Sequence, residues 1–141
     1  MRAWEEIQED LKWDGMWRDI YVQEIGAAEW RKLLRALPLW NYELAYSDPT
    51  GSAELPGDFP GAEDWACHLT VKVGAITLNC HFFLIEEIEF DFDPREVKVQ
   101  NDWLILYEFL KRLGRLLDRP VIVTYENTPK AVIAEWWPGQ A

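Results

Sequence analysis

Alternating carboxylates are the feature of this sequence with the clearest capacity for chemistry. Glu87, Glu89, Asp91 and Asp93 stand at every second position, and side chains two residues apart on a β-strand project to the same side. Such a row can collect a hard divalent cation or present negative charge to a cationic partner. Pro94 interrupts the row, and the spacing of a calcium loop is missing. We therefore expect no metal at these residues and favour a partner-binding surface.

A second group of acids precedes this row. The segment 47–64 is rich in glycine and proline, and it holds five acidic residues without one basic residue. Loops of this length in a compact domain are usually functional or mobile. We predict that this long acidic loop joins the strand acids and one tryptophan in a single partner-binding surface. The predicted surface consists of Asp58, Glu63, Asp64, Glu87, Glu89, Asp91, Asp93 and Trp137.

The tryptophan belongs to a pair, since Trp137 directly follows Trp136. Neighbouring residues of a strand point to opposite faces, so we expect one of the two indoles in the core and the other in solvent. An exposed tryptophan beside acids offers a large contact area and can stack on an arginine of a partner.

The net charge favours the same surface. The chain of 141 residues has a formal net charge of −11, and residues 41–96 contribute −10 of it, from 12 acidic and 2 basic residues. Nucleic-acid binders neutralise phosphates with Lys and Arg, so this chain is a poor candidate for one. A surface of one sign attracts a partner of the opposite sign. The same excess is also typical of a surface that only keeps a protein soluble, and both interpretations stay open.

The elements that must position these residues follow from hydrophobic periodicity. Apolar residues recur at helical spacing in 27–37 and again between Asn101, which we expect as the N-cap, and Pro120. Strand patterns cover 16–25, 41–46, 65–73, 75–83, 87–93, 120–125 and 131–136. This order predicts one α+β domain over residues 1–141, with a mainly antiparallel sheet of about six or seven strands and two main helices packed on one face. Residues 1–14 leave two alternatives open, a short amphipathic helix and a loosely attached, frayed segment.

The two histidines lie in the predicted hairpin. A two-residue turn that begins at Gly74 places His68 opposite His81, whereas a turn that begins at Val73 does not. We favour the first register because glycine tolerates the positive φ that the turn requires. Two imidazoles could share zinc with a carboxylate, but a further ligand would have to come from elsewhere. We expect them to be ordinary polar residues of the sheet.

The cysteines and serines of the sequence are not arranged for nucleophilic catalysis. Cys67 and Cys80 fall on the apolar side of their strands, away from the neighbouring histidines. No serine lies in a nucleophile-elbow pattern, and no glycine-rich phosphate loop occurs. We expect no cofactor, and the enzymatic alternative is a carboxylate-based, metal-dependent hydrolase. Its candidate residues are Glu89, Asp91, Asp93, His68 and His81.

The start of the sequence is acidic where a signal peptide would be basic and then apolar. No run approaches the roughly 20 apolar residues needed to cross a bilayer, and two cysteines are too few for a disulfide framework. We expect a reduced, cytoplasmic protein, monomeric or homodimeric, without membrane or nucleic-acid partners.

Three stretches carry a resemblance: WRDIYV at 17–22, TLNCHFF at 77–83 and EIEFD at 87–91. They are similar to segments of small uncharacterised bacterial proteins, some of which resemble immunity proteins of toxin systems. The resemblance implies a binding role and carries no catalytic residue with it. Together with the charge, it predicts a small, acidic, non-enzymatic binding or inhibitor module of the immunity type that docks a basic protein.

Overall fold

A computed structural model describes residues 1–60 and 66–140 of the chain. The helices are α1 (Trp4–Asp10), α2 (Ala27–Ala36) and α3 (Gln100–Leu117), with two one-turn helices, η1 (Leu37–Leu39) and η2 (Pro94–Glu96). The strands are β1 (Arg18–Gln23), β2 (Glu43–Ser47), β3 (His68–Val73), β4 (Ile76–His81), β5 (Glu87–Phe92), β6 (Val121–Tyr125) and β7 (Val132–Trp136).

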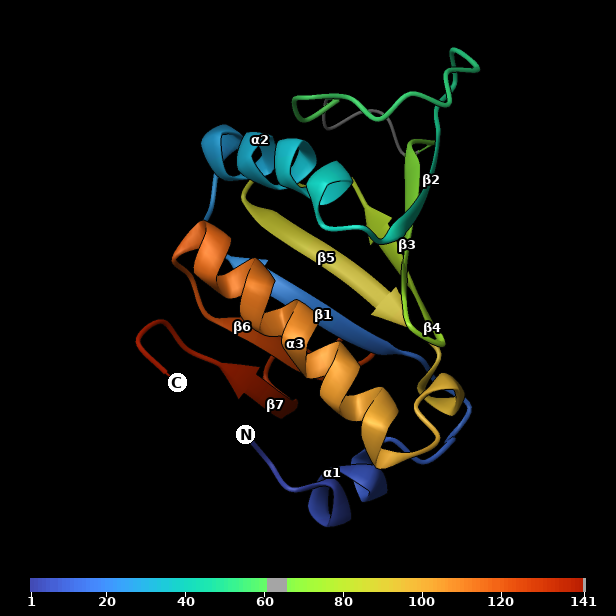
Figure 1. Cartoon of the computed structure of the whole chain (residues 1–141), viewed down its shortest axis with the longest axis vertical. Helices are drawn as coiled ribbons and strands as arrows, with labels where there is room; N and C mark the ends of the chain where they lie inside the picture. Colours follow the sequence, from blue (N-terminus) through green and yellow to red (C-terminus); the bar gives the residue numbers. More distant parts are fainter. Residues whose placement is uncertain (61–65, 141) are drawn as a thin grey trace.

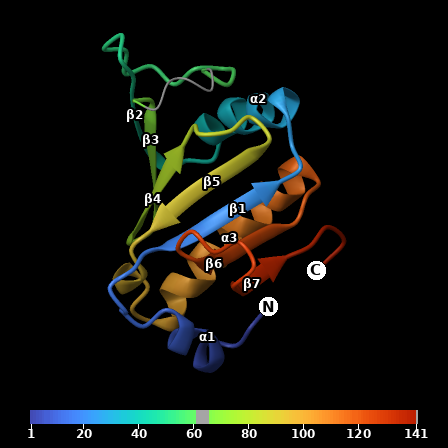
Figure 2. The ribbon, with the colours of Figure 1, turned by 180° about the vertical axis from the view of Figure 1, so that it is seen from behind.

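The seven strands form one antiparallel sheet in the order β2-β3-β4-β5-β1-β6-β7 (Figure 1). β1 comes first in the chain but lies between β5 and β6, so it is a central strand. α2 and α3 both pack on the same face of the sheet, and the view from behind shows the strands in front of them (Figure 2). The predicted α+β architecture, with two main helices on one face, is confirmed.

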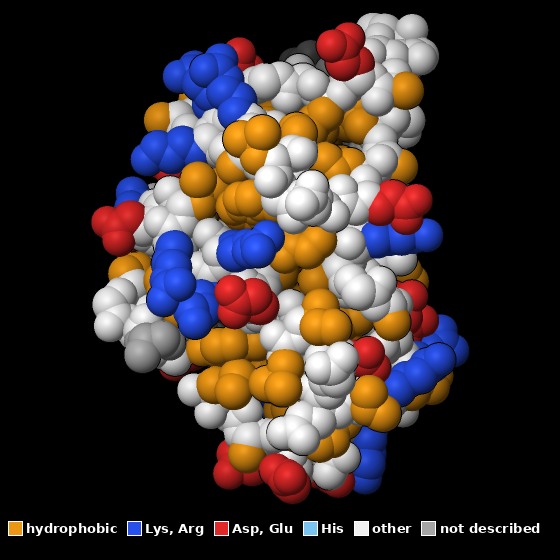
Figure 3. All heavy atoms as spheres, viewed as in Figure 1, with side chains coloured by type: hydrophobic (Ala, Val, Ile, Leu, Met, Phe, Trp, Pro, Cys, Tyr) orange, Lys and Arg blue, Asp and Glu red, His pale blue; other side chains and the backbone are white. Residues whose placement is uncertain are grey.

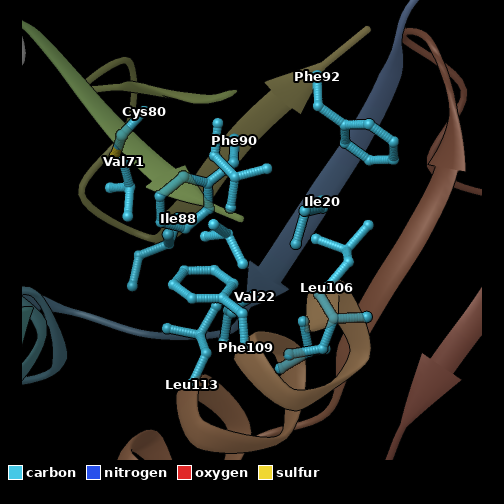
Figure 4. Packing of buried hydrophobic residues seen from close by; sticks show 14 of the residues in the cluster. Ile20, Val22, Val71, Cys80, Ile88, Phe90, Phe92, Leu106, Phe109 and Leu113 are labelled. Atoms are coloured by element: carbon cyan, nitrogen blue, oxygen red, sulfur yellow. The ribbon is translucent and has the colours of Figure 1, made fainter. Parts of the chain in front are cut away.

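The core lies between the sheet and these two helices. Phe90 of β5 is fully buried, and its ring meets the ring of Phe109 of α3 edge to face, with centroids 5.5 Å apart (Figure 4). Ile20 and Val22 of β1 are fully buried on the same face. Each side chain of this kind contributes about 1.5–3 kcal/mol when it leaves water, so this covered face stabilises the fold.

The β3–β4 hairpin has the predicted register. His68 lies opposite His81, and Gly74, with φ +62°, begins the two-residue turn. Glycine is suited to this left-handed backbone because it has no Cβ. Cys67 and Cys80 are both buried, as expected for small core residues.

The start of α3 differs from the prediction. The helix begins at Gln100 and its N-cap is Val99, so Asn101 lies inside the first turn. A carboxylate oxygen of Asp102 accepts hydrogen bonds from the backbone N–H groups of Lys98 (3.0 Å) and Val99 (3.2 Å). Because Asp102 reaches back to these N–H groups, the helix starts without a capping side chain at Asn101.

The N-terminal segment forms the short helix α1, and this helix packs on the domain. Ile7 and Leu11 are buried. Arg18 is only 1% exposed, and its guanidinium donates to the backbone oxygens of Asp10 (2.9 Å) and Lys12 (3.0 Å). A buried arginine that donates to these carbonyls ties the segment to β1, which distinguishes it from a frayed end.

The connection from β2 to β3 contains the predicted acidic loop. Residues 48–60 form neither helix nor strand.

Throughout 1–60 and 66–140, no helix has the length and apolar character that crossing a bilayer requires.

Candidate functional site

One face of the sheet is left uncovered by α2 and α3 (Figure 2). This open face is formed by the strand residues that alternate with the buried ones. Glu87, Glu89 and Asp91 of β5 lie on it, because Ile88 and Phe90 point into the core. The acidic strand residues of the open face are Asp19, Glu43, Glu87, Glu89, Asp91 and Glu135. Lys72 is its one Lys or Arg within the strands, and it pairs with Glu43 at 3.3 Å.

The register brings the central polar residues together. Glu89 lies between His81 of β4 and Tyr21 of β1. Asp91, two residues further on, lies next to Asp19 of β1. These five residues, Asp19, Tyr21, His81, Glu89 and Asp91, form the open-face cluster, and three of them are carboxylates on two adjacent strands.

Hydrogen bonds in the cluster come from neutral groups and one imidazole. The Tyr21 hydroxyl donates to Asp19 at 2.9 Å, and the backbone N–H of Asn127 donates to the same Asp19 oxygen at 2.8 Å. Asn79 donates its amide N–H to Asp91 at 3.0 Å. His81 Nε2 lies 2.5 Å from the other oxygen of Asp91. Among the described residues, no Lys or Arg forms an ion pair with the cluster.

Burial shifts the protonation of the cluster. It raises the pKa of the Asp19 carboxyl, and the charge of Asp91 adds to the effect. Burial also raises the pKa of Glu89. Burial disfavours a charged imidazole, but the hydrogen bond and charge of Asp91 outweigh it, so the pKa of His81 is raised. Negative charge on the half-buried Glu89 is thus held at an energetic cost that an approaching cation would relieve, whereas Asp19 is only 3% exposed and lies beneath the surface that a partner could contact.

Four of the predicted partner-binding residues, Glu87, Glu89, Asp91 and Trp137, share this face. Glu87 lies on β5 beside Gln23, whose amide donates to it at 3.3 Å, and Glu89 and Asp91 belong to the cluster. Trp137 lies on the same side, where it lines a shallow hollow of about 230 Å³ with Tyr21 and Gln23. Trp137 is 51% exposed, whereas Trp136 is 1% exposed, as expected for neighbours at the end of a strand.

The other predicted residues lie elsewhere. Asp58 forms an ion pair with Arg31 of α2 at 2.6 Å, so it belongs to the helix side of the molecule. Asp93 caps η2 and pairs with Arg95 at 2.8 Å. Glu63 and Asp64 lie outside the described residues. The loop acid Asp58 therefore does not join the strand acids, because a helix arginine holds it.

Sequence reasoning grouped His81 with Glu89 and Asp91 only as candidate residues of a metal-dependent hydrolase, and it missed Asp19 and Tyr21 as their neighbours. Asp19 and Tyr21 alternate with buried Ile20 and Val22, a pattern that places them on a polar strand face. The pattern alone did not show which strand lies beside β1.

The structure also bears on the metal alternatives. The rings of His68 and His81 lie 6.0 Å apart, and His81 is engaged by Asp91. Within residues 1–60 and 66–140, no group of three or more His, Cys, Asp or Glu side chains is placed to hold a metal ion. His68 and His81 are therefore neighbours on the open face without a third ligand in that part of the chain.

Comparisons with protein-family models, with curated proteins and with solved structures found no match to this chain. The candidate site therefore rests on the geometry and charge of the open face.

Proposed function

We propose that the protein is a non-enzymatic, cytoplasmic binding module of the inhibitor or immunity type, which docks a basic protein on its open face. The observation that carries the proposal is the set of three neighbouring carboxylates at the centre of that face. Glu89 and Asp91 are half-buried on β5, beside the buried Asp19 of β1, and none of the three has a Lys or Arg partner among the described residues.

Three acids outside the open face, in contrast, have arginine partners. Asp10 pairs with Arg2 at 2.6 Å, Asp58 with Arg31 at 2.6 Å, and Asp93 with Arg95 at 2.8 Å. Carboxylates that repel one another destabilise a fold unless a cation compensates them. Cations of a partner can supply that compensation at the open face, and they would also be steered to it during encounter.

Aromatic side chains beside the acids add contact area. Phe83 is 42% exposed and stacks on the His81 ring, with centroids 4.8 Å apart and planes 4° apart. Trp137 is exposed on the other side of β1. Aromatic residues next to charged groups are typical of protein interfaces, where they contact apolar surface and stack on arginine.

The proposal can be tested by nuclear magnetic resonance with a synthetic peptide in which arginine alternates with glycine and serine. We expect chemical-shift changes confined to β4, β5 and β1 at low salt, weakened at high salt. A peptide with citrulline in place of arginine keeps the shape without the charge and should cause no change. Changes that map to other surfaces, or that persist unchanged in the citrulline peptide, would contradict the proposal.

A second titration distinguishes the enzymatic alternative. Mg²⁺, Mn²⁺ and Zn²⁺ are added separately, and the heat of binding is measured. Tight binding of one ion, lost when Glu89 and Asp91 are replaced by Gln and Asn, would favour a metal-dependent hydrolase over a binding module.

A further inference from the structure

A second candidate surface lies on the helix side, away from the open face. A hollow of about 500 Å³ lies between the end of η1 and the C-terminal half of α3. It is lined by Leu39, Trp40, Asn41, Arg112, Arg115 and Leu116. The space-filling view of this side shows Lys and Arg side chains next to apolar ones over α2 and α3 (Figure 3).

The local backbone holds an apolar side chain in solvent. Leu37 of η1 is fully buried, whereas Leu39, two residues later, is 80% exposed. The chain then turns through Asn41, which has φ +62°. A non-glycine residue in this region of backbone space is uncommon. Leu39 therefore projects into solvent next to this turn, at the rim of the hollow.

The charge of the hollow is opposite to that of the whole molecule. Arg112 donates to the backbone oxygen of Trp40 at 3.4 Å, and its guanidinium lies 5.7 Å from the Tyr42 ring. The side chains of Lys111 and Arg115 form no hydrogen bond or ion pair with any described residue. Glu108, one turn before Arg112, is the acid of α3 nearest to these bases in sequence, and no ion pair within 4.0 Å joins it to them. Lys111, Arg112 and Arg115 against Glu108 and the C-cap residue Asp118 leave this end of α3 positive in a chain of net charge −11.

We propose that this hollow binds an acidic peptide segment of a partner protein. A carboxylate of the segment bridges Arg112 and Arg115, and a neighbouring apolar side chain of the segment covers Leu39. Guanidinium groups bind carboxylates with two parallel, charge-assisted hydrogen bonds. This surface is separate from the open face, so the inference does not rest on the proposed docking of a basic protein.

A peptide fits better than an extended polyanion. Leu39, Trp40 and Leu116 make half of the lining apolar, and apolar surface gives no contact with a phosphate backbone. The net charge of −11 also repels a long polyphosphate beyond the few bases of the hollow. A short segment with one leucine and one or two glutamates avoids most of that repulsion.

The test is a titration of the full chain with a capped synthetic peptide of alternating glutamate and leucine. Nuclear magnetic resonance of the protein monitors the binding. We expect saturable shift changes at residues 39–41 and 112–116. The double variant Arg112→Gln with Arg115→Gln should weaken binding about tenfold or more, because two charge-assisted contacts are lost. Leu39→Ser should weaken it about threefold or more.

Matched controls separate this site from general charge effects. Lys98→Gln with Lys130→Gln removes the same charge from exposed positions elsewhere and should leave the affinity unchanged. Glu89→Gln on the open face should also have no effect. All variants are at solvent-exposed positions or on the other face, and a thermal melt verifies that each is folded.

Three results would overturn the inference. Equal binding of a peptide with glutamine in place of glutamate would exclude charge recognition. Inorganic phosphate or a single-stranded oligonucleotide that binds the same residues more tightly than the peptide would exclude a peptide site. Concentration-dependent self-association that the arginine double variant abolishes would assign the hollow to a second copy of the chain.

Discussion

Neighbouring residues of β5 belong to two surfaces with different tasks. Phe90 is fully buried against Phe109 of α3, whereas Glu89, one position earlier, lies on the open face between His81 and Tyr21. The covered face consists of close-packed apolar side chains, and the centre of the open face gathers three carboxylates that have no Lys or Arg partner among the described residues. The contrast teaches that the sheet is stabilised from one side, which leaves the other side available for charge that folding does not require.

The largest expected effect tests this division on one strand. Phe90→Ala should lower the free energy of unfolding by about 3–5 kcal/mol, because it leaves a cavity under α3. Glu89→Gln, at the adjacent position, should change it by less than about 1 kcal/mol, because it keeps the shape and removes a carboxylate that burial disfavours. Urea unfolding of both variants measures the difference, and equal losses would show that the two faces are not separate in function.

Gly114 of α3 shows how closely the covered face is packed. A Cβ at Gly114 would lie 2.2 Å from a ring carbon of Trp136, which is 1% exposed. Replacing glycine by alanine inside a helix normally stabilises it by about 1 kcal/mol. Here Gly114→Ala should instead destabilise the protein by about 1–3 kcal/mol, because the core is overpacked.

The Trp136 ring is the nearest obstacle to a Cβ at position 114, and the carbonyl oxygen of Arg119 follows at 3.1 Å. Combining Gly114→Ala with Trp136→Leu removes the clash, so the loss in the double variant should be smaller than the sum of the two single losses. Thermal or urea unfolding of the four proteins gives the coupling. Additive losses would mean that the ring of Trp136 does not limit the space at position 114.

The open face should leave its own signature in the pH dependence of stability. The folded-state pKa of Glu89 is raised, so between its ordinary value and the raised value the folded protein binds more protons than the unfolded one. Stability from this group is therefore lost as the pH rises through that window. Glu89→Gln removes the loss, so the stability of the variant relative to the parent should increase with pH across the window. Urea unfolding at a series of pH values checks this, and a constant difference would contradict it.

The smallest expected effect concerns His81. Its folded-state pKa is raised by Asp91 despite burial, so its contribution to stability is present below the ordinary imidazole pKa and is lost as the pH rises through the raised value. Asp91→Asn should lower the pKa of His81. The variant removes the carboxylate charge that raises this pKa, and burial, which lowers it, remains. Titration of the imidazole resonances measures the change, and an unaltered pKa in the variant would exclude Asp91 as the cause.

Local patterns predicted the elements well. The turn at Gly74 set the register of the β3–β4 hairpin, and the alternation around Phe90 placed Glu89 and Asp91 on one face. In each case the information lies within a few residues of chain, because a turn or an alternation fixes which neighbours share a side.

Contacts between distant segments were not predictable in this way. The position of β1 beside β5 brings Asp19 next to Asp91, and no spacing in the sequence specifies which strands become neighbours. Asp58 of the loop pairs with Arg31 of α2 for the same reason. The acidic surface inferred from composition was therefore broader than the group of carboxylates that the sheet assembles.

In the proposed function, the position of negative charge, and not its total, creates the docking surface. Two triple variants test it with the arginine peptide: Glu87→Gln, Glu89→Gln and Asp91→Asn on the open face, and Glu5→Gln, Glu6→Gln and Glu9→Gln on α1. Each changes the net charge from −11 to −8. We expect the Kd to rise about tenfold or more in the open-face triple and to stay unchanged in the α1 triple. An equal rise in both would contradict the claim, because it would show that only the overall charge attracts the peptide.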